Sequence, residues 1–245
     1  MSDFNQVGVA NFHACIDTIR LNETIIKKQE IIDILEAYHN LSPVSVLFVG
    51  FSSFIFAQYN ANIYITDIDD QIQQYLTSQG ISYTYIPRSE LKNYYKKFQV
   101  VIAVDEFFTY SDSDQNQRDL ILEISDLVTD YLITTLRDYK NQDYRDREFS
   151  QPTVLKKSNG SQIFLEAHSF DGQDRSLWNS AIYQITNPNN ILTVYGSFNR
   201  RVMYFKQLAK FSIDAGATNF LVHKNLMYKS LIKRNFEHVI TVKFN

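Results

Sequence analysis

Short apolar runs alternate with amphipathic stretches over the first part of the chain. Five such runs lie at 44–49, 62–66, 82–86, 99–104 and 131–135. Helix-like stretches separate them at about 53–59, 69–79, 89–97 and 113–128. Nearly continuous apolar runs are typical of strands buried on both faces. Their alternation with helices predicts βαβ units, a mostly parallel sheet and right-handed crossovers.

The pattern differs on either side of this alternation. Residues 7–40 place apolar side chains at helical spacing. Beyond Asn141 the segments 162–168, 181–185 and 191–195 look like strands, and Asn187-Pro-Asn-Asn190 is a strong turn signal. We therefore expect an antiparallel pair near the C-terminus. A helix over about 201–215 and strands at 220–223 and 239–244 complete the expected elements.

These elements predict one domain with an α/β, Rossmann-like fold. The N-terminal helices form a cap over residues 1–42, and the Rossmann-like core covers 43–141. The remaining strands and a C-terminal α/β segment cover 142–245.

Composition narrows the class of protein. The chain has 245 residues, of which 44% are hydrophobic and 21% charged, close to globular averages. A net charge of −3 does not favour a general attraction to nucleic acid, although a local basic patch stays open. The N-terminus lacks the pattern of a secretory signal, and no run approaches the roughly 18 apolar residues of a membrane span. We expect a soluble cytoplasmic protein with no membrane segment.

A metal site and a disulfide are not expected. Cys15 is the single cysteine, and the five histidines are scattered. No group of these residues has the spacing of zinc ligands.

Polar residues follow four of the predicted strands at their carboxyl ends. These residues are Gly50-Phe-Ser-Ser53, Asp67, Asp105-Glu106 and Arg137-Asp138. In open parallel sheets, ligands bind beyond this edge, near the point where the strand order reverses. The sequence therefore predicts a ligand site at the carboxyl edge of the sheet.

The strand 44–49, its turn at Gly50 and the acid Asp67, 17 residues later, resemble class I S-adenosylmethionine-dependent methyltransferases. The resemblance covers about residues 40–140 and implies a sheet of the class I methyltransferase type with S-adenosylmethionine as cofactor. It places Gly50, Phe51, Ser52 and Ser53 at the methionine part of the cofactor. It places Asp67 and Ile68 at the ribose, where an acid accepts hydrogen bonds from the hydroxyls.

The turn after the first strand departs from this family. It reads Gly50-Phe-Ser-Ser-Phe-Ile-Phe56, where the family usually holds two or three glycines, and the whole chain has seven. Two functions stay open. One is methyl transfer to an unknown acceptor, and the other is a non-catalytic scaffold or binding protein that has lost the cofactor site.

The segment after the fourth strand reads Asp105-Glu-Phe-Phe-Thr-Tyr110. The resemblance implies that Asp105 and Glu106 lie at the reacting centre, where a carboxylate could hold the acceptor or act as base, and that Tyr110 contacts the acceptor. The alternative is that Asp105 caps the next helix and that Phe107 and Phe108 belong to the core. Residues 111–114 read as the N-terminal cap of that helix.

Further candidate acceptor contacts lie downstream. Arg137 and Lys140 could bind a carboxylate or a phosphate, or Arg137 could form a surface pair with Asp138. Glu166 and His168 share one face of a strand, where they could transfer protons, and Trp178 could stack on a planar acceptor. The alternative is a half-exposed strand with an anchoring tryptophan.

The C-terminal part is basic. The residues that make it so include Arg200, Arg201, Lys206, Lys210, Lys224, Lys229, Lys233 and Arg234. They indicate first a solvated helix face and second a contact with phosphate or nucleic acid. The acceptor and the oligomeric state are not fixed by the sequence.

Overall fold

The computed structural model describes the main chain and side chains of 45–50, 62–66, 80–103, 107–111, 113–136, 199–223 and 238–244, with Asp33, Gln73 and Thr77. It describes the backbone alone for Arg137, Glu237 and the strand residues 147–149, 153–157, 160–171, 174–186 and 191–198. The predicted helices at 7–40 and 53–59 lie outside these residues, apart from Asp33, which is helical. Gln73 and Thr77, within the predicted helix 69–79, are also helical.

The larger sheet has seven strands in the order β11-β12-β5-β4-β1-β2-β3. Their bounds are β1 Ser45–Val49, β2 Asn62–Ile65, β3 Thr84–Tyr85, β4 Phe98–Ala103, β5 Val128–Arg137, β11 Asn219–His223 and β12 Glu237–Lys243. Strands β1 to β5 are parallel to one another, whereas β12 is antiparallel to both β5 and β11. The predicted mostly parallel sheet is therefore confirmed.

The described helices cover this sheet and complete the core. They are the 3-10 helices η2 (Arg88–Tyr94) and η3 (Phe107–Thr109) and the α-helices α4 (Asp114–Ser125) and α5 (Phe205–Asp214). The apolar side chains of β1, β4 and β5 pack against those of α4 and α5, among them Leu120, Ile121, Ile124, Leu208 and Phe211.

Two predicted helices differ from those in the structure. The segment 89–97 forms the seven-residue 3-10 helix η2, which ends before Lys96 takes a positive φ of 49°. Helix α4 ends at Ser125 rather than at residue 128, because Val128 already pairs with Phe98 at the start of β5. The predicted cap is confirmed, since the Ser113 Oγ accepts a hydrogen bond of 3.1 Å from the Asn116 N–H.

A second, antiparallel sheet follows β5. It has the order β10-β9-β8-β6, with β7 also paired to β8. The strands are β6 Arg147–Phe149, β7 Thr153–Lys157, β8 Gly160–Asp171, β9 Asp174–Thr186 and β10 Ile191–Arg201. The predicted antiparallel pair is confirmed as β9 and β10.

Strand β10 corrects one predicted boundary. It continues through Arg201, so the helix expected from residue 201 begins at Phe205. The antiparallel partner β9 supplies backbone hydrogen bonds over this polar stretch, which the local pattern did not indicate.

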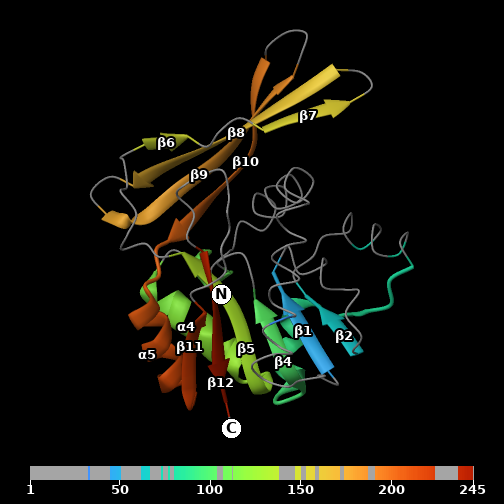
Figure 1. The fold of residues 1–245 in the computed structure, drawn as a ribbon, viewed down its shortest axis with the longest axis vertical. Helices are drawn as coiled ribbons and strands as arrows, with labels where there is room; N and C mark the ends of the chain where they lie inside the picture. Colours follow the sequence, from blue (N-terminus) through green and yellow to red (C-terminus); the bar gives the residue numbers. More distant parts are fainter. Residues whose placement is uncertain are drawn as a thin grey trace.

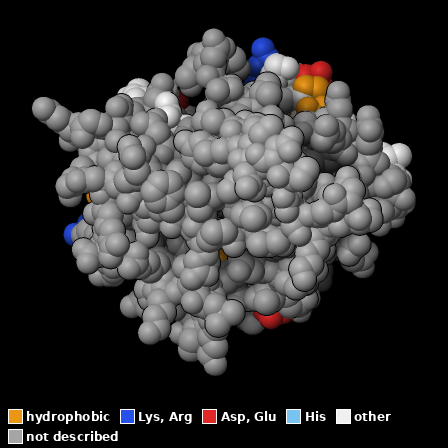
Figure 2. All heavy atoms as spheres, turned by 90° about the horizontal axis from the view of Figure 1, so that it is seen from above, with side chains coloured by type: hydrophobic (Ala, Val, Ile, Leu, Met, Phe, Trp, Pro, Cys, Tyr) orange, Lys and Arg blue, Asp and Glu red, His pale blue; other side chains and the backbone are white. Residues whose placement is uncertain are grey.

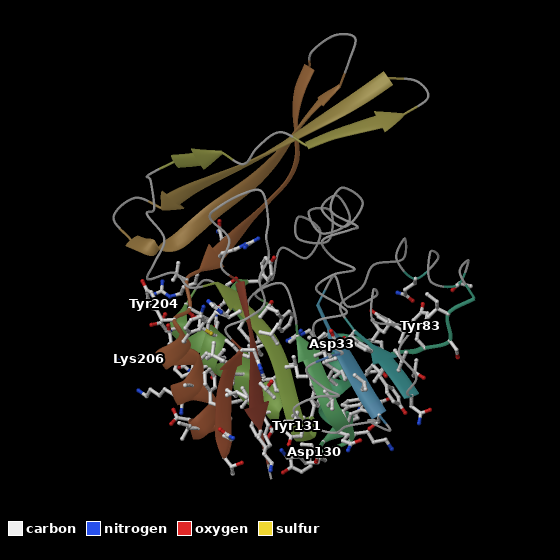
Figure 3. The ribbon with its side chains drawn as sticks, viewed as in Figure 1. Asp33, Tyr83, Asp130, Tyr131, Tyr204 and Lys206 are labelled. Atoms are coloured by element: carbon white, nitrogen blue, oxygen red, sulfur yellow. The ribbon has the colours of Figure 1, made fainter. Side chains whose placement is uncertain are left out.

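Figure 1 shows the antiparallel sheet, coloured yellow to orange, beyond the upper edge of the larger sheet. In Figure 3, Asp130 and Tyr131, near the start of β5, lie at the lower edge, and Tyr204, just after β10, lies near the upper one. The upper edge is thus the carboxyl edge of the parallel strands. Viewed from above, the described side chains come to the surface only in small areas (Figure 2).

Within the described residues, no helix has the length and apolar character of a membrane span.

Candidate functional site

The carboxyl ends of the parallel strands are aligned at one edge. Val49 of β1 lies opposite Ala103 of β4, and Ala103 lies opposite Thr134 of β5. On the other side, Phe48 lies opposite Ile65 at the end of β2. The chain continues from β1 to β2 and β3 on one side and then crosses to β4 and β5 on the other, so the strand order reverses between β1 and β4.

This alignment brings the carboxyl ends of β1, β2, β4 and β5, the strands that the predicted clusters follow in sequence, to one edge of the sheet. Gly50 and Arg137 are the two cluster members that the structure describes, and Arg137 only by its backbone, opposite Glu237 of β12. The other predicted site residues here lie outside the described residues. They are Phe51, Ser52, Ser53, Asp67, Ile68, Asp105, Glu106 and Lys140.

Gly50 closes β1 in a conformation that requires glycine. Its φ is +100°, a region that L side chains rarely adopt. A Cβ at this position would lie 3.1 Å from the Phe107 Cδ2 atom. Gly80 and Gly216 also have positive φ, but a Cβ on either would meet nothing within 4 Å. Among these three glycines, only Gly50 is required both for its φ and for the space beside it.

Phe107 is the neighbour that fills the space beside Gly50. It is buried and packs edge-on against Phe108, with ring centroids 5.5 Å apart. The Arg88 guanidinium carbon lies 5.5 Å from the centre of the Phe107 ring, and the Arg88 Nη2 lies 3.5 Å from a Glu123 oxygen on α4. Both phenylalanines are buried, as the packing interpretation expects. Arg88 was not among the predicted site residues.

Thr66 closes β2 directly before Asp67. It is completely buried, and its N–H donates a hydrogen bond of 3.1 Å to the Phe48 carbonyl. Among the residues that the structure describes, its Oγ1 has no hydrogen-bond partner. A buried hydroxyl without a partner costs about 1–3 kcal/mol, so such groups in native proteins usually mark a water or ligand position. An orphaned hydroxyl therefore lies at the strand end where the resemblance implies a ribose.

Tyr110, which follows η3, and Arg200, on β10 of the antiparallel sheet, meet at the same edge. The Arg200 guanidinium carbon lies 5.1 Å from the centre of the Tyr110 ring. Tyr110 is 3% exposed and Arg200 is 4% exposed. The interpretation of Arg200 as part of a solvated helix face was wrong, because this residue belongs to strand β10 and is buried.

The strand register places a second predicted site residue, Trp178, opposite Arg200. Trp178 of β9 lies directly opposite Arg200 of β10, and Phe170 of β8 lies opposite Trp178. His168 lies two residues from Phe170 along β8, opposite Ser180. The backbone register therefore places Trp178 beside Arg200, the residue whose guanidinium contacts Tyr110.

The end of β10 is anchored on the first turns of α4. Arg201 forms an ion pair with Asp114 through its Nε, and its carbonyl accepts a hydrogen bond of 2.9 Å from the Gln117 Nε2. Gln117 is completely buried. These contacts attach the antiparallel sheet to the carboxyl edge of the parallel sheet. In the described part of the chain, no three His, Cys, Asp or Glu residues are grouped as metal ligands would be.

No protein-family model matches this chain, and no curated protein matches it in sequence. Solved methyltransferase structures match it over nearly its whole length. The sugar N-methyltransferase KedS8 from Streptoalloteichus sp. has a TM-score of 0.70 at 6% identity, covering 92% of this chain and 90% of its own. DesVI from Streptomyces venezuelae has a TM-score of 0.69 at 8% identity, covering 95% and 96%.

An S-adenosylmethionine-dependent methyltransferase from Clostridium acetobutylicum has a TM-score of 0.67 at 11% identity, covering 96% of this chain and 98% of its own. At these identities the likeness establishes the fold. The chain has the class I methyltransferase fold, as the order of its elements predicted.

Proposed function

We propose that the protein transfers a methyl group from S-adenosylmethionine to an acceptor bound beyond the carboxyl edge of the larger sheet. The observation that carries this proposal is Gly50. It stands at the reversal of strand order, with a φ of +100° and a Cβ position only 3.1 Å from the Phe107 ring. Cofactor-binding turns need a backbone that a ligand can approach closely. The turn has a single glycine, and this glycine stands at the position where that approach is required.

The residues at two strand ends fit the cofactor. The Gly50 backbone would face the methionine part, together with Phe51, Ser52 and Ser53. Asp67 would accept hydrogen bonds from the ribose hydroxyls, with Ile68 beside it. The buried Thr66 Oγ1, which has no partner among the described residues, gives this strand end a further polar group. When bound, S-adenosylmethionine supplies an electrophilic methyl group.

The remaining site residues act on the acceptor. Asp105 or Glu106, at the end of β4, would hold the nucleophile of the acceptor and take up its proton. Arg137, Lys140, His168, Trp178 and Tyr110 would orient the acceptor. This alignment of the partners is the main contribution that a protein makes to a displacement of this kind.

Names of similar structures suggest which acceptor to test first. KedS8 is a sugar N-methyltransferase, and CalS10 from Micromonospora echinaspora is an amino pentose methyltransferase. An amine on a small polar molecule is therefore the first class of acceptor to test with this chain.

Thermal unfolding with S-adenosylmethionine and S-adenosylhomocysteine tests the proposal. A ligand at 100 times its Kd adds about 2.7 kcal/mol to the free energy of unfolding, so binding should raise the Tm clearly. Asp67→Ala should remove most of this increase. Asp130→Ala is the matched control, because Asp130 lies at the opposite edge of the sheet (Figure 3).

The outcome distinguishes an enzyme from a scaffold. If neither compound at millimolar concentration raises the Tm of the wild-type chain, the proposal is wrong and a scaffold that has lost the cofactor site is favoured. If both Asp67→Ala and the wild type respond equally, the ribose assignment is wrong.

A further inference from the structure

A continuous series of contacts connects the antiparallel sheet with the glycine turn. It begins at Arg200 on β10, whose guanidinium lies 5.1 Å from the centre of the Tyr110 ring. The Tyr110 N–H then donates a hydrogen bond of 3.3 Å to the Phe107 carbonyl across η3. The Phe107 ring in turn lies 3.1 Å from the Cβ position of Gly50.

The residues of this series are buried. Tyr110, Phe107 and Phe108 are each at most 3% exposed, and Arg200 is 4% exposed. The next turn is fixed as well, because the Ser111 N–H donates to the carbonyl of the buried Thr109 at 2.8 Å. Close-packed interiors transmit displacements instead of absorbing them. A change in the position of Tyr110 therefore reaches Phe107 and, through it, Gly50.

Arg200 and its neighbour Arg201 have different partners. Arg201 is ion-paired to Asp114 at the start of α4, and its exposed partner gives this contact access to solvent. Arg200 is buried against the ring of Tyr110, the residue that directly follows η3. A desolvated cation–π contact is stronger than an exposed ion pair, because water does not compete for the cation. Arg200 is thus the residue of β10 that bears on η3.

We propose that Arg200 is a positioning residue, which holds η3 and thereby the turn at Gly50 in the conformation that binds the cofactor. This inference deepens the proposed function and rests on it for the ligand. Arg200 acts through Tyr110 and Phe107. The antiparallel sheet then takes part in cofactor binding, although it lies outside the Rossmann-like core.

The first test compares amide hydrogen exchange in ligand-free variants. Arg200→Gln should accelerate exchange of the Phe107–Ser111 amides about fivefold relative to the wild type, the size of effect seen along coupled contacts. Arg201→Gln, one residue away on the same strand, should leave these amides unchanged. Equal exchange in the two variants would overturn the inference. This measurement needs no cofactor, so it decides the role of Arg200 even if the proposed function fails.

The second test measures the Kd of S-adenosylhomocysteine by calorimetry. Arg200→Gln should weaken binding about fivefold, whereas Arg200→Lys and Arg201→Gln should bind within about twofold of the wild type. Equal affinity of Arg200→Gln and Arg201→Gln contradicts the positioning role while leaving the proposed function intact. A wild type that binds no S-adenosylhomocysteine contradicts the proposed function, and the exchange measurement still applies.

Variants of Tyr110 remove the other partner of the contact with Arg200. They provide a separate test in case Arg200→Gln does not fold. Tyr110→Phe keeps the ring and should keep the wild-type exchange rates of the Phe107–Ser111 amides. Tyr110→Leu removes the ring and should reproduce the faster exchange and weaker binding of Arg200→Gln. The double variant Arg200→Gln/Tyr110→Leu should be no worse than either single variant, because both remove one contact. Additive effects would show that the two residues act independently and that the inference is wrong.

Discussion

The Phe107 ring stands 3.1 Å from the place where a Cβ on Gly50 would be. That distance is tighter than most real Cβ contacts, and the Gly50 φ of +100° is itself unfavourable for any L side chain. Two constraints of different origin, one on the backbone and one on the space beside it, therefore select glycine at the end of β1.

Gly50→Ala should destabilise the chain and weaken binding of S-adenosylhomocysteine. The strained backbone costs about 1–3 kcal/mol, and displacement of the Phe107 ring adds to this. Chemical denaturation measures the first effect and calorimetry the second.

Gly216→Ala is the matched control for this variant. Gly216 has a φ of +91°, and nothing lies within 4 Å of its Cβ position. It should lose stability through the same backbone strain and keep the wild-type affinity for the ligand. If both variants lose affinity equally, the loss reflects general destabilisation and not the turn at β1.

The Thr66 hydroxyl gives a second prediction, in which removal of the hydroxyl weakens cofactor binding without lowering the stability of the ligand-free protein. Because its Oγ1 has no partner among the described residues, Thr66→Val should leave the ligand-free stability unchanged or raise it by up to about 1 kcal/mol. The same substitution should weaken cofactor binding about fivefold if the hydroxyl bonds the ligand. Urea unfolding and calorimetry on one preparation measure both.

Thr134→Val provides the comparison for Thr66. The Thr134 Oγ1 donates a hydrogen bond of 2.6 Å to the Ala103 carbonyl, between β5 and β4. Its removal should cost about 1 kcal/mol of unfolding free energy. A Thr66→Val variant that loses as much as Thr134→Val would mean that the Thr66 hydroxyl already has a partner in the ligand-free protein.

The strands of the larger sheet could be predicted because a strand that is buried on both faces is apolar at nearly every position. The runs at 44–49 and 99–104 are almost wholly apolar, and the side chains from Val46 to Val49 are completely buried. The carboxyl edge followed from the same reasoning, since parallel strands that alternate with helices must end on one side. Gly50 was found in this way, before the contact with Phe107 was visible.

The contact between Arg200 and Tyr110 could not be predicted from the local pattern. The stretch Ser197-Phe-Asn-Arg-Arg201 is mostly polar and follows a register shift between Val194 and Gly196, so it does not read as a strand. Its conformation comes from backbone pairing with β9, and Arg200 within it is buried against Tyr110, 90 residues earlier in the chain. Long-range pairing of this kind leaves no periodicity in the sequence.

Lys96 gives a third prediction, at the amino edge of the sheet. Its φ of 49° is the one positive value among the described residues other than glycine. The Lys96 Nζ donates hydrogen bonds of 2.9 Å to the carbonyls of Ser125 and Val128, and its N–H donates to the Asp126 carbonyl at 2.8 Å. The side chain thus binds carbonyls at the end of α4 and the start of β5.

Lys96→Met should lower the free energy of unfolding by about 1.5–3 kcal/mol, since hydrogen bonds from a charged group are lost. Lys97→Met, at the exposed neighbouring residue, should change it by less than about 0.5 kcal/mol. Neither variant should alter the affinity for S-adenosylhomocysteine, because both lie at the edge opposite Gly50. Equal stability of the two variants would show that the ammonium contacts contribute nothing.

Gln117 gives the last prediction, which concerns the attachment of the antiparallel sheet. This glutamine is completely buried on α4, where its Nε2 donates to the Arg201 carbonyl at 2.9 Å and its Oε1 accepts from the Gln207 Nε2 at 3.3 Å. Gln117→Leu keeps a side chain of similar size but leaves the Arg201 carbonyl without this donor.

The expected loss for Gln117→Leu is about 1–3 kcal/mol of unfolding free energy, the cost of a buried polar group whose partner is removed. Gln115→Leu on the same helix is the matched control, because its 2.7 Å hydrogen bond to Asp119 is exposed and such pairs contribute only about 0.2–0.5 kcal/mol. Urea unfolding followed by far-UV circular dichroism measures both. Because Gln117 contacts the backbone of β10, its loss should also speed amide exchange in Asn199–Arg201, which Gln115→Leu should not do. If β10 exchanges at the wild-type rate in Gln117→Leu, the sheet is held at this junction by Arg200 and Arg201 alone.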